Sequence, residues 1–179
     1  QRQMCIRDRS VTGPMGSRVK AYYGILADEK TVVMEMAQAA GITLVEEAQR
    51  NPGKATTYGV GEMIRDAVSR GYRKFIIGIG GSATNDGGIG MLRALGVKFL
   101  TKDGEEAGEG ADALGKIHFV SLEHLMPELK ECDFQIACDV TNPLCGEKGA
   151  TYIYGKQKGI REEEMPRIDA DMKLSLIHI

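Results

Sequence analysis

The chain has 179 residues, of which 42% are hydrophobic and 27% are charged, a composition typical of a globular protein that can bury a core. Acidic and basic residues are interspersed and give a net charge of -2, which argues against a nucleic-acid-binding stripe or a polybasic membrane patch. The longest apolar runs fall far short of the ~20 residues of a membrane span. We therefore expect a cytoplasmic protein with small-molecule partners, and neither nucleic acid nor membrane as a partner.

Both ends of the chain have unusual sequences. Residues 1–10 carry charges without apolar periodicity, so we predict neither a strand nor an amphipathic helix there. The strings MCIRDR (residues 4–9) and LSLIHI (residues 174–179) resemble translated adapter read-through at the ends of assembled reads. We expect residues 1–10 and 174–179 to be non-native and residues 11–173 to hold the fold.

The first half of the chain predicts a hairpin and a helix. Residues 19–26 alternate as in a strand, a turn follows at Asp28, and residues 31–36 return as a second strand. Thr56 or Thr57 is placed to cap a helix that reaches residue 69.

The second half predicts alternating strands and helices. Residues 74–79 (KFIIGI) form a nearly continuous apolar run, typical of a strand buried on both faces of a parallel or mixed sheet. Further elements are expected as a helix at 88–95, a strand at 97–100, a helix at 123–132, a buried strand at 134–138 and a helical pattern at 161–173. The predicted fold class is α/β, with a mixed sheet and flanking helices.

The most informative segment is GIGGSATNDGG, residues 78–88, which follows the predicted buried strand directly. Glycines allow close approach of several backbone N–H groups to an anion, and hydroxyl and amide groups add donors. Asp86 is a candidate to bind Mg²⁺ or to accept a proton. Candidate ligands for phosphate or substrate are Gly80, Gly81, Ser82, Thr84, Asn85 and Gly87. The open alternatives are that the glycines only build tight turns and that Asp86 only helps cap the next helix.

The same segment has a rival interpretation as a dinucleotide-binding motif. Gly78, Gly80 and Ala83 have the spacing G-x-G-x-x-A, and Asp103 lies about 20 residues further on. That motif requires its helix to begin near Ala83, whereas the following residues up to Gly88 disfavour a helix. No Walker A sequence occurs in the chain.

Two further segments carry candidate site residues. Asp139, Thr141 and Asn142 follow the strand at 134–138, although Asn-Pro is often only a turn. Lys156 and Lys158 lie in YGKQKG, which we interpret as a glycine-bracketed turn whose lysines contact phosphate or carboxylate; the alternative is that both are merely solvated.

In this order and spacing, GIGGSATNDGG, ACDVTNPLCGEKGA and YGKQKG resemble the glycerate kinase family of bacterial type, and so do VTGPMG and RNPGKATTYGVGEMI. The resemblance covers about residues 11–173. It implies two α/β domains with the active site in the cleft between them, and this chain corresponds mostly to the second, substrate-side domain. A strand with a D-S-F-K-G-type loop and a glycine-rich, acidic carboxyl-terminal region of the family are absent, so the chain is expected to be inactive alone.

The resemblance also implies an activity. Members of the family transfer the γ-phosphoryl group of ATP to D-glycerate with Mg²⁺, giving 2-phosphoglycerate or 3-phosphoglycerate. On this basis the loop glycines and hydroxyls hold phosphate or the glycerate carboxylate, and Asp86 or Asp139 serves the metal or the proton. Asn85 and Asn142 orient the substrate. The alternatives are a non-catalytic binding or interaction fragment and, further off, a nicotinamide-binding dehydrogenase domain.

Overall fold

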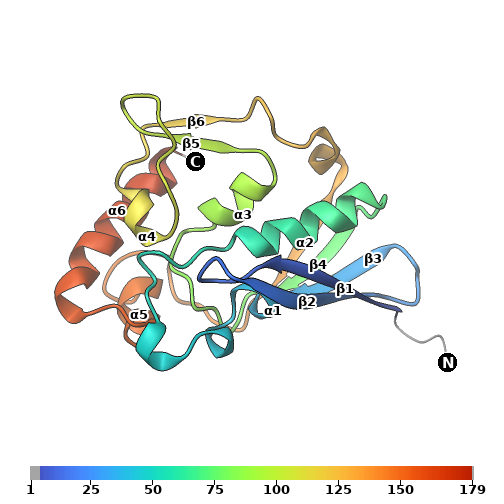
Figure 1. The fold of residues 1–179 in the computed structure, drawn as a ribbon, viewed down its shortest axis with the longest axis horizontal. Helices are drawn as coiled ribbons and strands as arrows, with labels where there is room; N and C mark the ends of the chain where they lie inside the picture. The colour runs from blue at the N-terminus through green and yellow to red at the C-terminus, as the bar shows by residue number, and fades with distance from the viewer. Residues whose placement is uncertain (1–4, 179) are drawn as a thin grey trace.

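The computed structural model describes residues 5–178 and the side chains as far as Ser175. Its centre is a five-stranded mixed sheet in the order β1-β2-β3-β4-β7 (Figure 1). The strands β1, β2 and β3 are joined antiparallel, whereas β3, β4 and β7 run parallel. The strands are β1 (Cys5–Thr12), β2 (Arg18–Ile25), β3 (Thr31–Glu35), β4 (Lys74–Gly78) and β7 (Asp133–Ala137).

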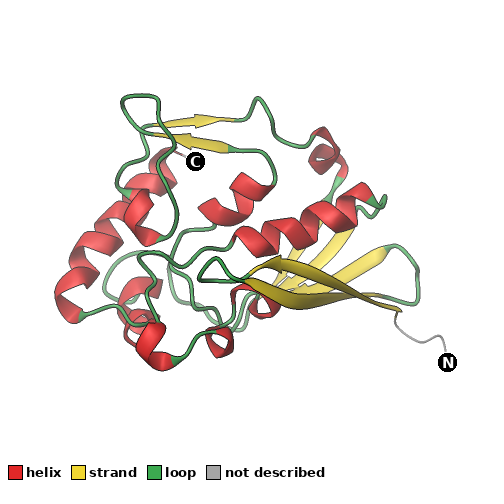
Figure 2. Ribbon diagram, in the orientation of Figure 1, coloured by secondary structure: helices red, strands yellow, loops and turns green. Residues whose placement is uncertain are grey.

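Helices lie over the sheet and beside it, and long loops connect them to the strands (Figure 2). A separate two-stranded ribbon is formed by β5 (Lys98–Leu100) and β6 (Phe119–Ser121). The helices are α1 (Ala37–Ala40), α2 (Tyr58–Ser69), α3 (Ile89–Ala94), α4 (Ala111–Leu114), α5 (Ala150–Lys158) and α6 (Met165–His178).

Two apolar clusters form the core. The first lies between α2 and the sheet, where Met63 and Ile64 of the helix pack with Phe75 and Ile77 of β4. The second joins α3, the β5–β6 ribbon, α4 and α6. The loop that contains the GIGGSATNDGG sequence connects these two clusters, because it runs from the end of β4 to the start of α3.

Several predictions from the sequence are confirmed. The fold is α/β with a mixed sheet and flanking helices. The hairpin of β2 and β3, the strand β4 and the short helix α3 lie where the sequence predicts them. Helix α2 ends at Ser69 as expected. The Thr57 side chain makes no cap hydrogen bond to the helix, whereas the Thr56 hydroxyl accepts from the N–H of Tyr58, the first helical residue, at 3.2 Å.

The prediction that residues 1–10 form neither a strand nor a helix was wrong over the described residues 5–10. They belong to β1, which pairs along its whole length with β2. Most of β1 is exposed, and its charged side chains form ion pairs, Arg9 with Asp66 and Asp8 with Lys20. The strand is held by backbone pairing rather than by burial of one face, so apolar alternation could not reveal it. Residues 1–4 lie outside the described residues.

The strand at residues 134–138 was predicted correctly as a strand but wrongly as buried. β7 is the edge strand of the sheet, and all of its residues are exposed. Phe134 stacks on Phe75 at a centroid distance of 4.8 Å, yet remains 37% exposed, and Ile136 is 53% exposed. An apolar run therefore indicated the strand but not its position at the edge.

Two further segments differ from the predictions. The expected helix at 123–132 is only a short 3-10 helix, Pro127–Glu131. Pro127 has no N–H to bond to a preceding helical turn, so a helix can start at this residue but cannot run through it from residue 123. The supposed lysine-containing turn at 154–159 is the last part of α5, which ends at Gly159 in a left-handed conformation.

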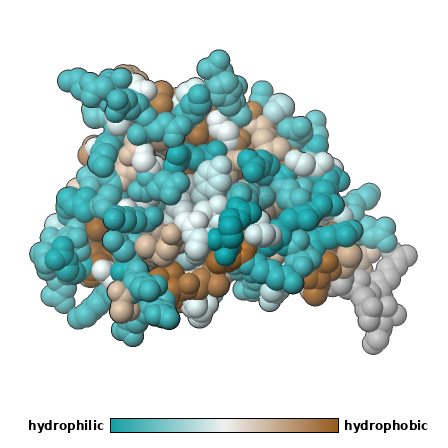
Figure 3. All heavy atoms as spheres, in the orientation of Figure 1, coloured by the Kyte–Doolittle hydropathy of each residue, from teal (hydrophilic) through white to brown (hydrophobic). Residues whose placement is uncertain are grey.

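In the part of the chain that the structure describes, no helix is long and apolar enough to cross a membrane. The face of the molecule in Figure 3 is largely hydrophilic, with small apolar areas between polar side chains.

Candidate functional site

The carboxyl ends of three parallel strands meet at one edge of the sheet. Glu35, Gly78 and Ala137 are paired residues at the ends of β3, β4 and β7. The Met36 N–H donates to the Gly78 carbonyl, and the Ile79 N–H donates to the Ala137 carbonyl, so the loops after these strands begin side by side. In Figure 1, α1 and α5 lie at this edge, far from the marked amino terminus. Ligands of such sheets gather at this edge.

One side of the loop at 78–88 is fixed to the α1 region by backbone hydrogen bonds. The Ile42 N–H donates to the Gly81 carbonyl, and the Ala83 N–H donates to the Ala40 carbonyl. The backbone N–H groups of Gly80, Gly81 and Ser82 donate to no described residue. Gly80 and Gly81 are exposed and Ser82 is half-buried. The loop thus has three consecutive backbone N–H donors without a partner among the described residues, an arrangement suited to an anion.

Asp86 lies at the centre of a buried hydrogen-bond network and is 1% exposed. One carboxylate oxygen accepts from the N–H and the hydroxyl of Thr57, at 2.9 and 2.7 Å, and from the Gly90 N–H at 3.2 Å. The other oxygen accepts from the Gly88 N–H at 3.0 Å. The Thr57 hydroxyl in turn accepts from the Met91 N–H. Asp86 therefore joins the starts of α2 and α3, which is the structural alternative raised for it above.

The end of the loop strongly favours glycine. Gly87 and Gly88 have φ values of 59° and 81°, which are left-handed conformations that residues with a Cβ rarely adopt. A Cβ on Gly87 would also lie 2.9 Å from the Met172 sulfur of α6. Gly87 thus lets the second core cluster approach the loop, and the structure gives it a packing role.

Helix α5 is attached to the loop by two buried side chains. The Asn85 amide donates to the Thr151 hydroxyl at 3.1 Å, near the start of the helix. At its end, the Lys158 amine donates to the Ser82 hydroxyl at 2.9 Å and to the Thr84 carbonyl at 2.7 Å. Burial lowers the pKa of the Lys158 amine to about 8, and the nearby Asp86 carboxylate acts in the opposite direction.

The second candidate segment lies on the loop after β7. Asp139 and Thr141 are exposed, and neither side chain has a hydrogen-bond partner among the described residues. Asn142 is also exposed, but its amide donates to the Lys148 carbonyl and its oxygen accepts from the Tyr154 hydroxyl. Asn142 therefore fixes the loop against α5, whereas Asp139 is a free carboxylate beside the carboxyl edge of β4.

The two candidate lysines lie in different surroundings. Lys158 is 8% exposed and faces the loop at 78–88. Lys156 is exposed and forms an ion pair with the equally exposed Glu162 at 3.2 Å. The position of Lys156 fits the solvated alternative.

The structure brings together the loop residues Ser82, Thr84, Asn85 and Asp86 with Lys158, which is 70 or more positions away in the sequence. Sequence reasoning missed Thr151 in this site and considered Thr57 only as a helix cap. Both are buried threonines whose partners lie far along the chain. Their burial was not signalled locally, because threonine is as common on a surface as in a polar network.

The nicotinamide alternative required a helix beginning near Ala83. Residues 83–88 are not helical, and α3 begins at Ile89. This geometry argues against a dinucleotide-binding loop.

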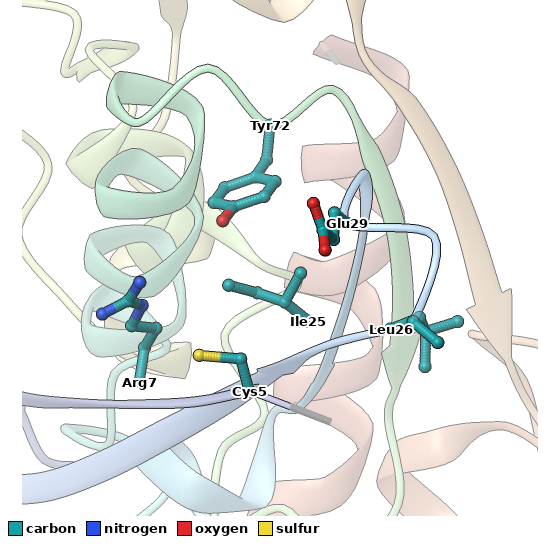
Figure 4. Close-up of a pocket in the computed structure, with 7 residues that line it drawn as sticks. Cys5, Arg7, Ile25, Leu26, Glu29 and Tyr72 are labelled. Atoms are coloured by element: carbon teal, nitrogen blue, oxygen red, sulfur yellow. The ribbon is translucent and has the colours of Figure 1, made fainter. Parts of the chain in front are cut away.

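The surface hollow shown in Figure 4 lies away from this edge. It is lined by residues of β1 and β2, the turn after β2, and the segment before β4, with Arg7, Glu29 and Tyr72 among them. Since Tyr72 precedes the start of β4, the hollow lies at the amino ends of the parallel strands. It is an open surface depression without a cluster of catalytic groups.

The comparisons with known proteins agree on one family. The sequence model described as "Glycerate kinase family" matches residues 1–177. The glycerate kinase of Haemophilus influenzae is 47% identical over 160 residues, which are 89% of this chain and 42% of that protein. The glycerate 2-kinase of Escherichia coli K12 is 46% identical over 162 residues, covering 90% of this chain and 42% of the relative.

A solved structure gives the same result. The crystal structure of a protein designated glycerate kinase 2, from Salmonella typhimurium LT2, superposes with a TM-score of 0.94 at 42% identity. It covers 98% of this chain and 47% of the Salmonella chain. The chain therefore spans less than half the length of the relatives it matches. On the family match and these identities together, the chain belongs to the glycerate kinase family.

Proposed function

We propose that this chain supplies the anion-binding part of an ATP-dependent glycerate kinase, which transfers the γ-phosphoryl group of ATP to D-glycerate. The observation that carries the proposal is the row of free N–H groups at Gly80, Gly81 and Ser82, next to the buried amine of Lys158. Phosphoryl transfer depends mainly on positioning anions and neutralising their charge. Names of relatives that include glycerate kinase and glycerate 2-kinase support the substrate, and 2-phosphoglycerate is the product we favour over 3-phosphoglycerate.

Within this function the loop binds an anionic group of one of the two substrates, either a phosphate of ATP or the carboxylate of D-glycerate. Backbone N–H groups bind either anion without side-chain charge, and the half-buried Ser82 hydroxyl adds a donor. Thr84 and Asn85 are buried and hold the loop in place. Asn142 keeps the neighbouring loop in position, and the exposed Thr141 lies next to it as a further polar group.

Mg²⁺ fits this site with few protein ligands. No group of three or more His, Cys, Asp or Glu residues suited to a metal occurs among the side chains that the structure describes, residues 5–175. Mg²⁺ in kinases is held by one or two carboxylates together with substrate phosphates, so a single free carboxylate is sufficient. Asp139 has that freedom, whereas both oxygens of Asp86 already accept hydrogen bonds. We propose that Asp139 either binds the metal or accepts the proton of the acceptor hydroxyl. Asp86 has a positioning role. A bound Mg²⁺ would neutralise phosphate charge.

Gly80→Ala tests the anion-binding loop separately from the fold. A Cβ at Gly80 meets no atom within 4 Å and its φ is not left-handed, so the variant is expected to fold like wild type. The added methyl group would occupy the space in which an anion approaches the backbone. Calorimetric titration with D-glycerate and, separately, with ATP–Mg²⁺ should show weaker binding by Gly80→Ala for the ligand that this loop holds. Equal affinities of wild type and variant for both ligands would contradict the proposal.

A further inference from the structure

The buried amine of Lys158 contacts two polar groups of the loop at 78–88. It donates to the Ser82 hydroxyl at 2.9 Å and to the Thr84 carbonyl at 2.7 Å. The residue is only 8% exposed, which limits direct contact between the amine and a ligand in solvent. Ser82 is half-buried and lies beside the free N–H groups of Gly80 and Gly81, so it stands between Lys158 and the exposed edge of the loop.

The hydrogen-bond direction at Ser82 has a chemical consequence. A hydroxyl that accepts a hydrogen bond from an ammonium group keeps its own proton for another acceptor. Among the described residues, no acceptor receives the Ser82 hydroxyl proton. Charged Lys158 therefore leaves Ser82 as a hydrogen-bond donor toward the edge of the loop, where its proton can join the free backbone N–H groups.

We propose that Lys158 is a positioning residue that acts through Ser82, and that the loop binds its anion well only while the Lys158 amine carries its proton. This inference rests on the anion-binding role of the loop proposed above. A neutral amine has a lone pair that can accept the Ser82 hydroxyl proton, and its two remaining N–H bonds can still donate to the Thr84 carbonyl. The hydrogen bond between Lys158 and Ser82 then reverses, and the serine no longer donates to the ligand.

The change falls in an accessible pH range. Burial lowers the pKa of the Lys158 amine to about 8, and the Asp86 carboxylate is the one charged group among the described residues that acts on it, in the direction of a higher pKa. An anion that requires the protonated amine should bind less tightly as the pH rises through this value, up to about tenfold per pH unit. Because the neutral state loses only the serine hydrogen bond to the anion, the expected loss from about pH 7 to about pH 9.5 is just under about tenfold in total.

Sulfate is the probe for this test, because it carries the same charge throughout this pH range and is a compact oxyanion. We would measure its dissociation constant for the full 179-residue chain by NMR titration between pH 7 and 9.5. The variants are Lys158→Met and Ser82→Ala, and Lys102→Met is the control, since it removes one charge from an exposed turn residue. Far-UV circular dichroism of each variant checks that the fold is retained.

Wild type and Lys102→Met should lose affinity as the pH rises above about 8. Ser82→Ala should bind about tenfold more weakly at pH 7, the expected effect of losing one hydrogen bond to a charged group, and should show little pH dependence. Lys158→Met should also show little pH dependence, because methionine has no proton to lose and no amine lone pair to take the serine proton, and the double variant should be no weaker than Ser82→Ala. This non-additivity is the signature of two residues that act as one unit.

Three results would overturn the inference. If Ser82→Ala keeps the wild-type pH dependence, the charge of Lys158 acts on the anion without the serine. A wild-type affinity that is constant from pH 7 to 9.5 would show that protonation of the amine is not required, while the anion-binding loop itself would stand. If wild type binds no sulfate at any pH, both the inference and the proposed anion-binding role of the loop fail.

Discussion

Replacing Lys158 by Met should change how the stability of the protein depends on pH. The side chains are similar in length, but Met has no ionisable group. The wild-type amine has a pKa of about 8 in the folded protein, lowered by burial from the ordinary value of 10.5 in the unfolded chain. Between these two values the unfolded chain binds more protons at this residue than the folded protein does. The free energy of unfolding of the wild type therefore rises with pH across this window, relative to Lys158→Met.

The magnitude follows from the two pKa values. One pKa unit corresponds to about 1.4 kcal/mol, so the full effect between pH 8 and 10.5 is about 3 kcal/mol. From about pH 7 to about pH 9.5, a range that is easily measured, the wild type should gain about 2 kcal/mol relative to Lys158→Met. Groups common to both proteins cancel in this difference, including Tyr23, whose pKa is raised by burial and by its hydrogen bond to Asp66.

Urea unfolding followed by far-UV circular dichroism measures this difference at several pH values. Lys156→Met is the matched control, because Lys156 is on the same helix but is exposed, and its curve should run parallel to that of the wild type. The absolute stability of Lys158→Met is not the test, since Met also leaves the Ser82 and Thr84 oxygens without their donor. If the free energy of unfolding depends on pH in the same way in wild type and Lys158→Met, the claim that burial lowers the pKa of the Lys158 amine is refuted.

Three other substitutions test the packing of the site, all by urea unfolding. Asp86→Ala should destabilise the protein by about 3 kcal/mol or more, because buried donors lose their acceptor. The control Asp139→Ala, on an exposed loop, should have a stability close to that of the wild type. An equally small effect of Asp86→Ala would contradict the hydrogen-bond network. Thr151→Val should cost about 1 to 3 kcal/mol by leaving the buried Asn85 amide without its acceptor, and a neutral result would show that this bond does not hold α5 to the loop. Gly61→Ala should cost about 1 to 3 kcal/mol, because its Cβ would overlap the backbone of α3, and unchanged stability would mean that the two helices can move apart freely.

Much of the fold can be predicted from the sequence because burial leaves a periodic pattern. In α2 the apolar residues recur on one face, and all of that face is buried. β4 is a short apolar run between two parallel neighbours, as expected for an internal strand. These elements owe their stability to apolar contacts that repeat with the period of the backbone.

Elements that are held by other forces escaped prediction. The buried positions of α5 include Thr151, Gly155 and Lys158, which are spaced as on one face of a helix but are not apolar. A polar face that docks on a loop has no hydrophobic periodicity, and the sequence was interpreted as a turn. β1 is mostly exposed and is held by backbone pairing with β2. The exposure of β7 depends on which strand ends the sheet, a property that no local pattern contains.

The candidate site was predicted in its parts but not in its assembly. The sequence indicated the glycine loop, Asp86 and Lys158 separately. It did not indicate that Thr57 would donate a hydrogen bond to the carboxylate of Asp86, or that Lys158 would be buried against Ser82. These contacts join residues 29 and 76 positions apart, and they follow from the packing of α2 and α5 around the loop.

A chimaera tests the central claim most directly. This chain would replace the aligned 160 residues of the Haemophilus influenzae glycerate kinase, which shares 47% identity with it, and thereby be joined to the remainder of a longer family member. ADP release would be measured with D-glycerate and ATP–Mg²⁺, with the phosphorylated product identified by ³¹P NMR. We predict turnover that yields 2-phosphoglycerate and that falls at least tenfold on Gly80→Ala, since the added methyl group blocks the anion loop. A folded chimaera that releases no ADP with D-glycerate, or one whose turnover is unchanged by Gly80→Ala, would contradict the account.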